Sequence, residues 1–129
     1  MVEKKVIHVE GAATPTAPLS PAVSFGSLVF ISGQVSRDLK TGDPHLGTIE
    51  EETEQVLKNI ANILKQADSS PSCVLKTTVF LRDMKDFPKM NEIYSKHFPG
   101  EKPTRSTVGA ALAGEYKVEI EAIAFIPGK

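Results

Sequence analysis

The sequence predicts a two-layer domain in which two helices cover one face of a β-sheet. Two stretches carry apolar residues at helical spacing, and the other apolar stretches are short and bounded by turn residues. Their order is two or three strands, a helix, a strand, a second helix and two strands. The chain has 129 residues, of which 40% are hydrophobic, so we expect residues 1–129 to form one domain with one core.

The N-terminal part is expected to contain an extended loop and a buried strand. Residues 11–22 carry a proline at every third position from Pro15 to Pro21, and proline disfavours helix both at its own position and before it. Residues 28–31 form a compact apolar run that ends at Ser-Gly, which is typical of a strand buried on both faces. Residues 38–47 contain Thr-Gly-Asp-Pro and are predicted to form a loop.

Thr48 is expected to begin the first helix. Thr48 and Glu51 have the spacing of a capping box, in which each side chain satisfies a backbone N–H of the other residue. Glu54 and Lys58 are an i,i+4 pair on the exposed side, and the helix should end near residues 68–71. The apolar stripe of this helix consists of Val56, Leu57, Ile60, Ile63, Leu64 and Ala67.

The C-terminal part is expected to contain three strands and a second helix. Residues 73–82, 105–111 and 117–126 are predicted strands. In the first of them Leu75, Val79 and Leu81 share one face, and Val74, Thr78 and Phe80 share the other with Lys76. Asp86 is expected to cap the second helix, which ends at Pro99-Gly100 and carries the stripe Phe87, Met90, Tyr94, His97 and Phe98.

The two helical stripes leave the second face of the sheet uncovered although it is still apolar. A two-layer domain of this kind often buries its open face against another copy of itself. We therefore expect a homo-oligomer.

The composition excludes several classes of function. The 15 Lys and Arg residues nearly balance 16 Asp and Glu residues, and without a basic stripe nucleic-acid binding is not expected. The three histidines share no ligand spacing and do not lie near the single cysteine, Cys73, so no metal site is expected. Cys73 is expected to be a small buried residue. No segment has the pattern of a signal peptide or the length of a membrane span, so we expect a cytoplasmic protein without membrane contact.

Two features point to a site. In the last strand Glu119 and Glu121 fall on one face beside Ile123 and Phe125. Carboxylates are rarely buried without a partner, so either one of them has a cationic partner or a working role, or an edge strand exposes both to water. Arg105 enters a short strand directly after a loop, and its planar guanidinium matches a carboxylate. Its alternative is a surface salt bridge, so these residues indicate an anion site but no reaction.

Eight segments, in order over nearly the whole chain, resemble the YjgF/Rid family, also called the YER-type or L-PSP family. They are residues 17–22 (APLSPA), 29–34 (VFISGQ), 41–42 (TG), 55–60 (QVLKNI), 76–84 (KTTVFLRDM), 91–94 (NEIY), 103–106 (PTRS) and 118–124 (VEIEAIA). The resemblance implies an α+β fold similar to chorismate mutase, a homotrimer, and a ligand cleft at each subunit contact. It also implies cofactor-independent deamination, by hydrolysis, of reactive 2-enamine and 2-imine acids of the 2-aminoacrylate class. The products are 2-keto acids and ammonia. Because the substrates are reactive, the implied role is metabolite detoxification.

The family pattern assigns roles to particular residues. Arg105 would bind the substrate carboxylate through two charge-assisted hydrogen bonds. Glu119 would position or deprotonate the attacking water as a general base, and Glu121 is a weaker candidate for the same role. The other residues expected at the pocket are Ser32, Gly33 and Asn91.

The chain departs from the family pattern at three places. Leu19 stands where many deaminating members have an aromatic residue over the pocket, and Thr107 stands where a cysteine is common. The loop at residues 109–114 is shorter than usual. Two alternatives therefore remain: a deaminase specialised for an aminomuconate-like enamine, and a non-catalytic module that senses a carboxylate metabolite. A ribonuclease role, which some family names suggest, is disfavoured by the near-neutral charge.

Overall fold

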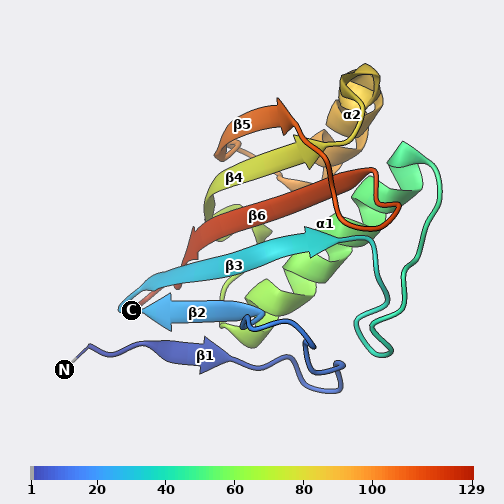
Figure 1. The fold of residues 1–129 in the computed structure, drawn as a ribbon. Coiled ribbons are helices and arrows are strands. Elements are labelled where there is room, and N and C mark those ends of the chain that lie inside the picture. Colours follow the sequence, from blue (N-terminus) through green and yellow to red (C-terminus); the bar gives the residue numbers. More distant parts are fainter. Residues whose placement is uncertain (1) are drawn as a thin grey trace.

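The computed structural model describes residues 2–129 as a six-stranded mixed sheet and two α-helices. The strand order is β1-β2-β3-β6-β4-β5, and every neighbouring pair is antiparallel except β4 and β5 (Figure 1). Two 3₁₀ turns lie at Pro71–Cys73 and Met84–Asp86. The main elements are β1 (Lys5–Ile7), β2 (Ala22–Phe25), β3 (Leu28–Val35), α1 (Ile49–Gln66), β4 (Val74–Leu81), α2 (Phe87–His97), β5 (Thr104–Gly109) and β6 (Val118–Phe125).

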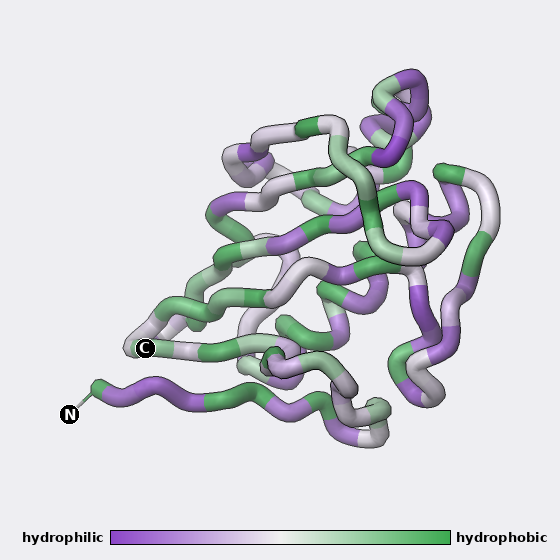
Figure 2. The backbone as a smooth tube through the Cα atoms, viewed as in Figure 1, coloured by the Kyte–Doolittle hydropathy of each residue, from purple (hydrophilic) through white to green (hydrophobic). Residues whose placement is uncertain are grey.

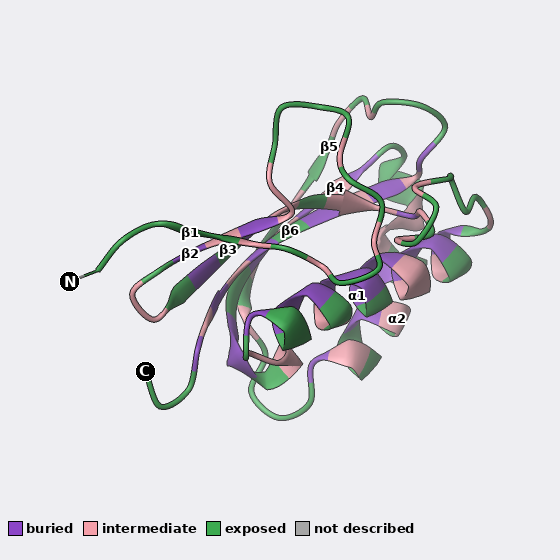
Figure 3. Cartoon of the chain, turned by 90° about the horizontal axis from the view of Figure 1, so that it is seen from below, coloured by how far each residue is buried: buried purple, intermediate pink, exposed green. Residues whose placement is uncertain are grey.

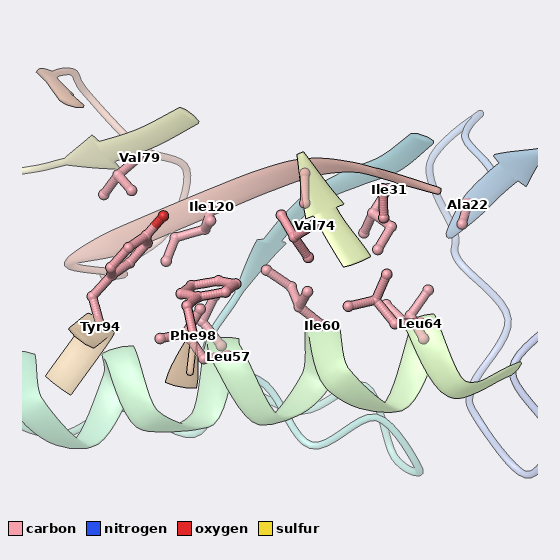
Figure 4. Packing of buried hydrophobic residues seen from close by; sticks show 14 of the residues in the cluster. Ala22, Ile31, Leu57, Ile60, Leu64, Val74, Val79, Tyr94, Phe98 and Ile120 are labelled. Atoms are coloured by element: carbon pink, nitrogen blue, oxygen red, sulfur yellow. The ribbon is translucent and has the colours of Figure 1, made fainter. Parts of the chain in front are cut away.

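Both helices lie on the same side of the sheet, and their buried positions face the strands (Figure 3). Figure 4 shows Leu57, Ile60 and Leu64 of α1 pointing toward Ile31 and Ile120 of the sheet. Each such side chain contributes about 1.5–3 kcal/mol by leaving water. The predicted two-layer α+β architecture is therefore confirmed.

The start of α1 forms as predicted. Thr48 Oγ1 accepts a hydrogen bond from the Glu51 N–H at 3.1 Å, and the Thr48 N–H donates to Glu51 Oε1 at 2.9 Å. The hydrogen bond that the carboxylate accepts from the Thr48 N–H, together with the Thr48 side chain, lowers the pKa of the Glu51 carboxyl. At the other end α1 stops at Gln66, slightly earlier than expected, and Asp68 adopts a left-handed φ of 60°. That conformation cannot continue a right-handed helix, and Asp tolerates it better than most residues.

Three sequence-based predictions were wrong. Residues 28–31 were expected to be buried on both faces, but Leu28 and Phe30 of β3 are exposed because no layer formed by residues 2–129 covers that side of the sheet. Asp86 makes no side-chain capping bond to α2; instead Asp83 accepts from the Lys85 N–H at 2.9 Å at the 3₁₀ turn before the helix. The register of β4 with β6 shifts between Val74 and Lys76. Because of this bulge Val74 is buried and Leu75 is exposed, the reverse of the alternation expected from sequence.

The sheet face opposite the helices is uncovered and partly apolar, as expected. Along one cross-strand row Val6 pairs with Val23, Val23 with Phe30, and Phe30 with Ile123. Phe30 keeps 43% of its surface exposed. Hydrophobic positions recur along β3, β4 and β6, and on β6 they alternate with hydrophilic ones (Figure 2). We call this surface the open face.

Glu52 is a fully buried carboxylate in the first turn of α1. Its Oε1 accepts from the Lys117 N–H at 2.9 Å, and its Oε2 lies 3.3 Å from both Lys117 Nζ and the Gly47 N–H. The carboxylate therefore joins the helix to the loop before α1 and to the residue preceding β6. Buried charges are tolerated only when such partners are complete.

We predict that Glu52→Ala lowers the free energy of unfolding by about 3 kcal/mol, because two backbone N–H groups lose their acceptor. The Lys117 ammonium is partly exposed and adds less. Glu52→Gln is the intermediate variant: its one side-chain oxygen can still accept from the Lys117 N–H, but the Gly47 N–H loses its acceptor, so the loss should be smaller than for Glu52→Ala. Urea denaturation measures both variants; an unchanged midpoint for Glu52→Ala would contradict this assignment.

Candidate functional site

Arg105 lies on the helix side of the edge strand β5. It is in register with Thr77 of β4, whose hydroxyl lies 2.6 Å from the Tyr94 hydroxyl. The guanidinium carbon of Arg105 is 4.8 Å from the centroid of the Tyr94 ring and 5.5 Å from that of Phe87. Such cation–π contacts contribute about 0.5–2 kcal/mol and hold the charge in place without neutralising it.

Arg105 has no carboxylate partner among residues 2–129, so the salt-bridge alternative is wrong. Among the described residues, Glu52 and Glu54 are the only carboxylates that form ion pairs, and neither pairs with Arg105. Arg105 instead lines an open cavity of about 420 Å³. Its guanidinium donors are therefore available to an anion from solution. The other lining residues are Asn91, Tyr94, Ser95, Lys102 and Pro103.

Asn91 and Thr107 bring further polar atoms to the same side of β5. Asn91 lies on α2 between Phe87 and Tyr94, one helical turn from each. Its Oδ1 and the Thr107 Oγ1 are both buried and have no hydrogen-bond partner among the described residues. Such unsatisfied atoms cost about 1–3 kcal/mol each. Two others among the described residues, Arg37 Nε and Thr53 Oγ1, lie away from Arg105. We call Arg105, Asn91 and Thr107 the arginine group.

A second set of polar residues lies at a β-bulge in β3. Ile31 pairs with Ala122 and Gln34 with Ile120, so Ser32 and Gly33 together oppose Glu121 alone. Bulges of this kind re-aim side chains and recur next to active sites. Ser32 Oγ donates to the Ser20 carbonyl at 2.6 Å. This bond holds the segment that carries Leu19, whose side chain is largely exposed, against the bulge.

Glu119 lies beside this bulge on the open face. It is in register with Val35 of β3 and Phe80 of β4. Because β6 is a central strand, the alternative of an edge strand that merely exposes two glutamates is wrong. Burial raises the pKa of the Glu119 carboxyl above its ordinary value, and the nearby Glu121 raises it further. We call Ser32, Gly33 and Glu119, with Leu19 beside them, the glutamate group.

The arginine and glutamate groups lie on opposite faces of one sheet. Arg105 shares the face of buried Thr77, whereas Glu119 alternates with Val118 and Ile120, which are fully buried beneath the helices. The strand β4 separates β5 from β6, which adds about 10 Å across the sheet. The sequence-predicted residues therefore form two half-sites in a single chain.

Sequence reasoning assigned no site role to three residues around Arg105. Phe87 and Tyr94 were interpreted only as part of the apolar stripe of α2, although their spacing around Asn91 puts all three on one helix face. Lys102 follows a Pro-Gly turn and shows no periodicity, so no pattern singled it out. In the part of the chain that the structure describes, no three His, Cys, Asp or Glu residues are grouped to hold a metal ion. No described helix is long and apolar enough to cross a bilayer.

Comparison with known proteins gives the family. A model of the family described as Endoribonuclease L-PSP matches residues 10–126. The chain belongs to this family. It is 46% identical to a RutC family protein of Pyrococcus horikoshii, over 95% of this chain and 98% of the relative. It is 44% identical to the 2-iminobutanoate/2-iminopropanoate deaminase of Mus musculus, over 94% of this chain and 90% of that enzyme.

A solved structure extends the family likeness to three dimensions. The Rid-family protein YyfA of Yersinia pestis superimposes with a TM-score of 0.90 at 38% identity, covering 95% of this chain and 99% of that one. The resemblance to the YjgF/Rid family that the sequence segments indicated is thus confirmed, together with the α+β fold.

We predict that Gly33→Ala reduces function while preserving the fold. A Cβ at Gly33 would overlap Oε2 of Glu119, which is the mobile end of a flexible side chain, so the carboxylate should move and the backbone should stay. Thermal unfolding should change little, whereas catalysed hydrolysis of a 2-imino acid should fall at least about tenfold. The control is Gly109→Ala, where φ is not left-handed and the added Cβ would meet mainly the exposed, flexible side chain of Met84. Full activity of Gly33→Ala would mean that the position of Glu119 does not matter.

Proposed function

We propose that this protein hydrolyses 2-enamine and 2-imine acids to 2-keto acids and ammonia. The observation that carries the proposal is Arg105, a guanidinium held over Tyr94 at an open cavity without a carboxylate partner. Small organic acids are bound by such a planar pair of donors. The murine relative named for 2-imino acids gives independent support. A cytoplasmic location stays a prediction.

We propose further that each site joins the arginine group of one copy to the glutamate group of another. The sheet separates the two groups within one chain, and only a second molecule can bring them to one substrate. Arg105 lies at an edge strand, where a neighbour has access, and Glu119 lies on the open face. The exposed apolar residues of that face, among them Phe30 and Val108, supply a reason for the copies to associate.

A contact between two different surfaces of the same chain can repeat until it closes into a ring. The family resemblance favours a ring of three, a homotrimer with three equivalent sites. Each chain would then contribute its arginine group to one site and its glutamate group to another.

The proposed reaction is a hydrolysis in which nothing is oxidised or reduced. An enamine first takes a proton at its β-carbon and becomes the imine. Arg105 binds the carboxylate, and Glu119 accepts a proton from the water whose oxygen bonds to C2. Glu119 gives this proton to the imine nitrogen, which produces a carbinolamine. The carbinolamine hydroxyl then passes its own proton through Glu119 to the nitrogen as the C–N bond breaks, so ammonia leaves and a keto group remains. Bound imines react readily with water, so orientation supplies much of the acceleration.

The remaining polar residues of the two groups are suited to bind the imine nitrogen, the carboxylate and the attacking water. Asn91 Oδ1 accepts a hydrogen bond from the imine N–H, and the Thr107 hydroxyl donates one to a carboxylate oxygen. Both atoms thereby gain the hydrogen-bond partner that they lack among the described residues. Ser32 and Gly33 form the floor beneath the attacking water. The exposed Leu19 covers the cleft with an aliphatic side chain.

Mixing two inactive variants tests the shared site directly. Arg105→Ala and Glu119→Gln should each lose at least about a hundredfold in kcat/KM, as is usual for an acid–base residue or a substrate clamp. When the two variants are refolded together in equal amounts, about a quarter of the contacts unite an intact Arg105 with an intact Glu119. Activity should therefore return to about a quarter of the parent value.

Controls for this experiment are circular dichroism and light scattering of each variant, which should match the parent chain. A mixture as inactive as its components would contradict the shared site. Full activity of Arg105→Ala alone would contradict the deaminase mechanism. Binding of keto acids without ammonia release from any imine would favour a metabolite sensor, and salt-dependent RNA binding would favour a ribonuclease.

The pH dependence of kcat/KM tests Glu119 as the base. A base works in its deprotonated form, so kcat/KM should rise with pH, and the raised pKa moves this rise above the ordinary range of glutamate. Glu121→Gln removes a like charge, so the rise in kcat/KM should shift to lower pH. Burial should still hold the pKa of Glu119 above its ordinary value. Rates are divided by the uncatalysed rate at each pH. An unchanged profile in Glu119→Gln would exclude it as the base.

A further inference from the structure

The cavity at Arg105 contains a second fixed cation that the proposed reaction does not use. Lys102 lines it, and no acidic residue does. Lys102 Nζ donates to the Ser95 carbonyl at 2.8 Å and to the Phe98 carbonyl at 2.5 Å. These carbonyls lie at the C-terminal end of α2, where a cation is favoured by the helix dipole. The ammonium is thereby held at the cavity instead of moving freely in solvent.

The two carbonyls leave Lys102 with bonding capacity and with its full charge. An ammonium group has three N–H donors, of which the carbonyls take two. Carbonyl oxygens are neutral, and Lys102 makes no ion pair within residues 2–129. One donor therefore remains for an anion in the cavity. The neighbouring Ser95 hydroxyl already donates to the Glu92 carbonyl at 3.0 Å, so the charge of Lys102 is the main attraction beside Arg105.

The size of the cavity exceeds what a three-carbon acid requires. At about 420 Å³ it falls in the range of cavities that hold much larger ligands, about 300–1,000 Å³. A substrate whose carboxylate is bound at Arg105 therefore has room to extend a side chain toward Lys102. The chemistry at the end of that side chain should complement an unpaired ammonium.

We propose that Lys102 selects imino acids with a second carboxylate, so that the preferred substrates are 2-imino dicarboxylic acids. Arg105 binds the carboxylate next to the imine carbon, and Lys102 binds the distal carboxylate. The proposal rests on the deaminase function proposed above. It assigns Lys102 a role in specificity and none in the bond-breaking step.

The test compares two substrates that differ only in the distal group. An amino-acid oxidase generates 2-iminoglutarate from glutamate and the corresponding amide from glutamine, and semicarbazide competes for each imine as it forms. The loss of semicarbazone then measures catalysed hydrolysis. Parent chain, Lys102→Gln, Lys102→Arg and Lys96→Gln are compared. Lys96 is a matched control because it lies in the last turn of α2, the end that Lys102 caps, but acts on Glu54 of α1.

We expect the parent chain to prefer 2-iminoglutarate over its amide. Lys102→Gln should lower this preference by about tenfold, the loss of one charge-assisted hydrogen bond at an open site. Lys102→Arg should retain the preference and Lys96→Gln should leave it unchanged. Because Lys102 also caps α2, a purely structural effect would reduce both substrates equally. An unchanged ratio in Lys102→Gln, with hydrolysis of both imines intact, overturns the proposal and leaves the deaminase function standing.

A binding measurement separates this proposal from the reaction itself. Calorimetry compares 2-oxoglutarate with 2-oxoglutaramate, its neutral amide, on the same variants. Tighter binding of 2-oxoglutarate that is lost in Lys102→Gln supports selection by Lys102 even if no imine is hydrolysed. Equal binding of both ligands to the parent chain overturns it.

Discussion

The alternation of side chains along β6 is the constraint on which the rest of the structure depends. This strand pairs with β3 on one side and β4 on the other, and its residues Val118, Ile120, Ala122 and Ala124 fill the core beneath the helices. Burying these four fixes the intervening positions on the open face. A shift by one residue would exchange the two sets and expel the apolar side chains. Hydrophobic burial thus sets the direction in which Glu119 points.

The same constraint limits what one chain can do. The helix side of the sheet provides a cation stacked on aromatic rings, and the open face provides a carboxylate whose burial favours the protonated form. Neither half has the complementary charge within its own surroundings. The proposed contact with another copy would cover the apolar open face, which is costly for an isolated domain in water. It would also bring the arginine group of one chain to the glutamate group of the next.

Periodicity predicted the elements and the faces of regular strands, because burial acts on every residue of a regular element alike. It therefore gave α1 with its capping box, the stripe of α2 and the common face of Glu119 and Glu121. It failed at Val74–Leu75, where a bulge interrupts the alternation. Strand alternation and residue chemistry singled out Arg105, Glu119 and Glu121, and the family resemblance supplied the other candidate residues and the reaction. Their division between two faces followed from the strand order, which pairs segments distant in sequence and leaves no local pattern.

The parallel pairing of β4 and β5 means that a single β–α–β unit builds the arginine half-site. Thr77, Asn91, Tyr94 and Arg105 all lie between the start of β4 and the end of β5, so their contacts close short stretches of chain. The glutamate half-site instead requires Gly33 to meet Glu119 across most of the sequence. Contacts of long sequence separation form late because loop-closure entropy opposes them. During folding, the surroundings of Arg105 can therefore be organised before the last strand brings Glu119 to Gly33.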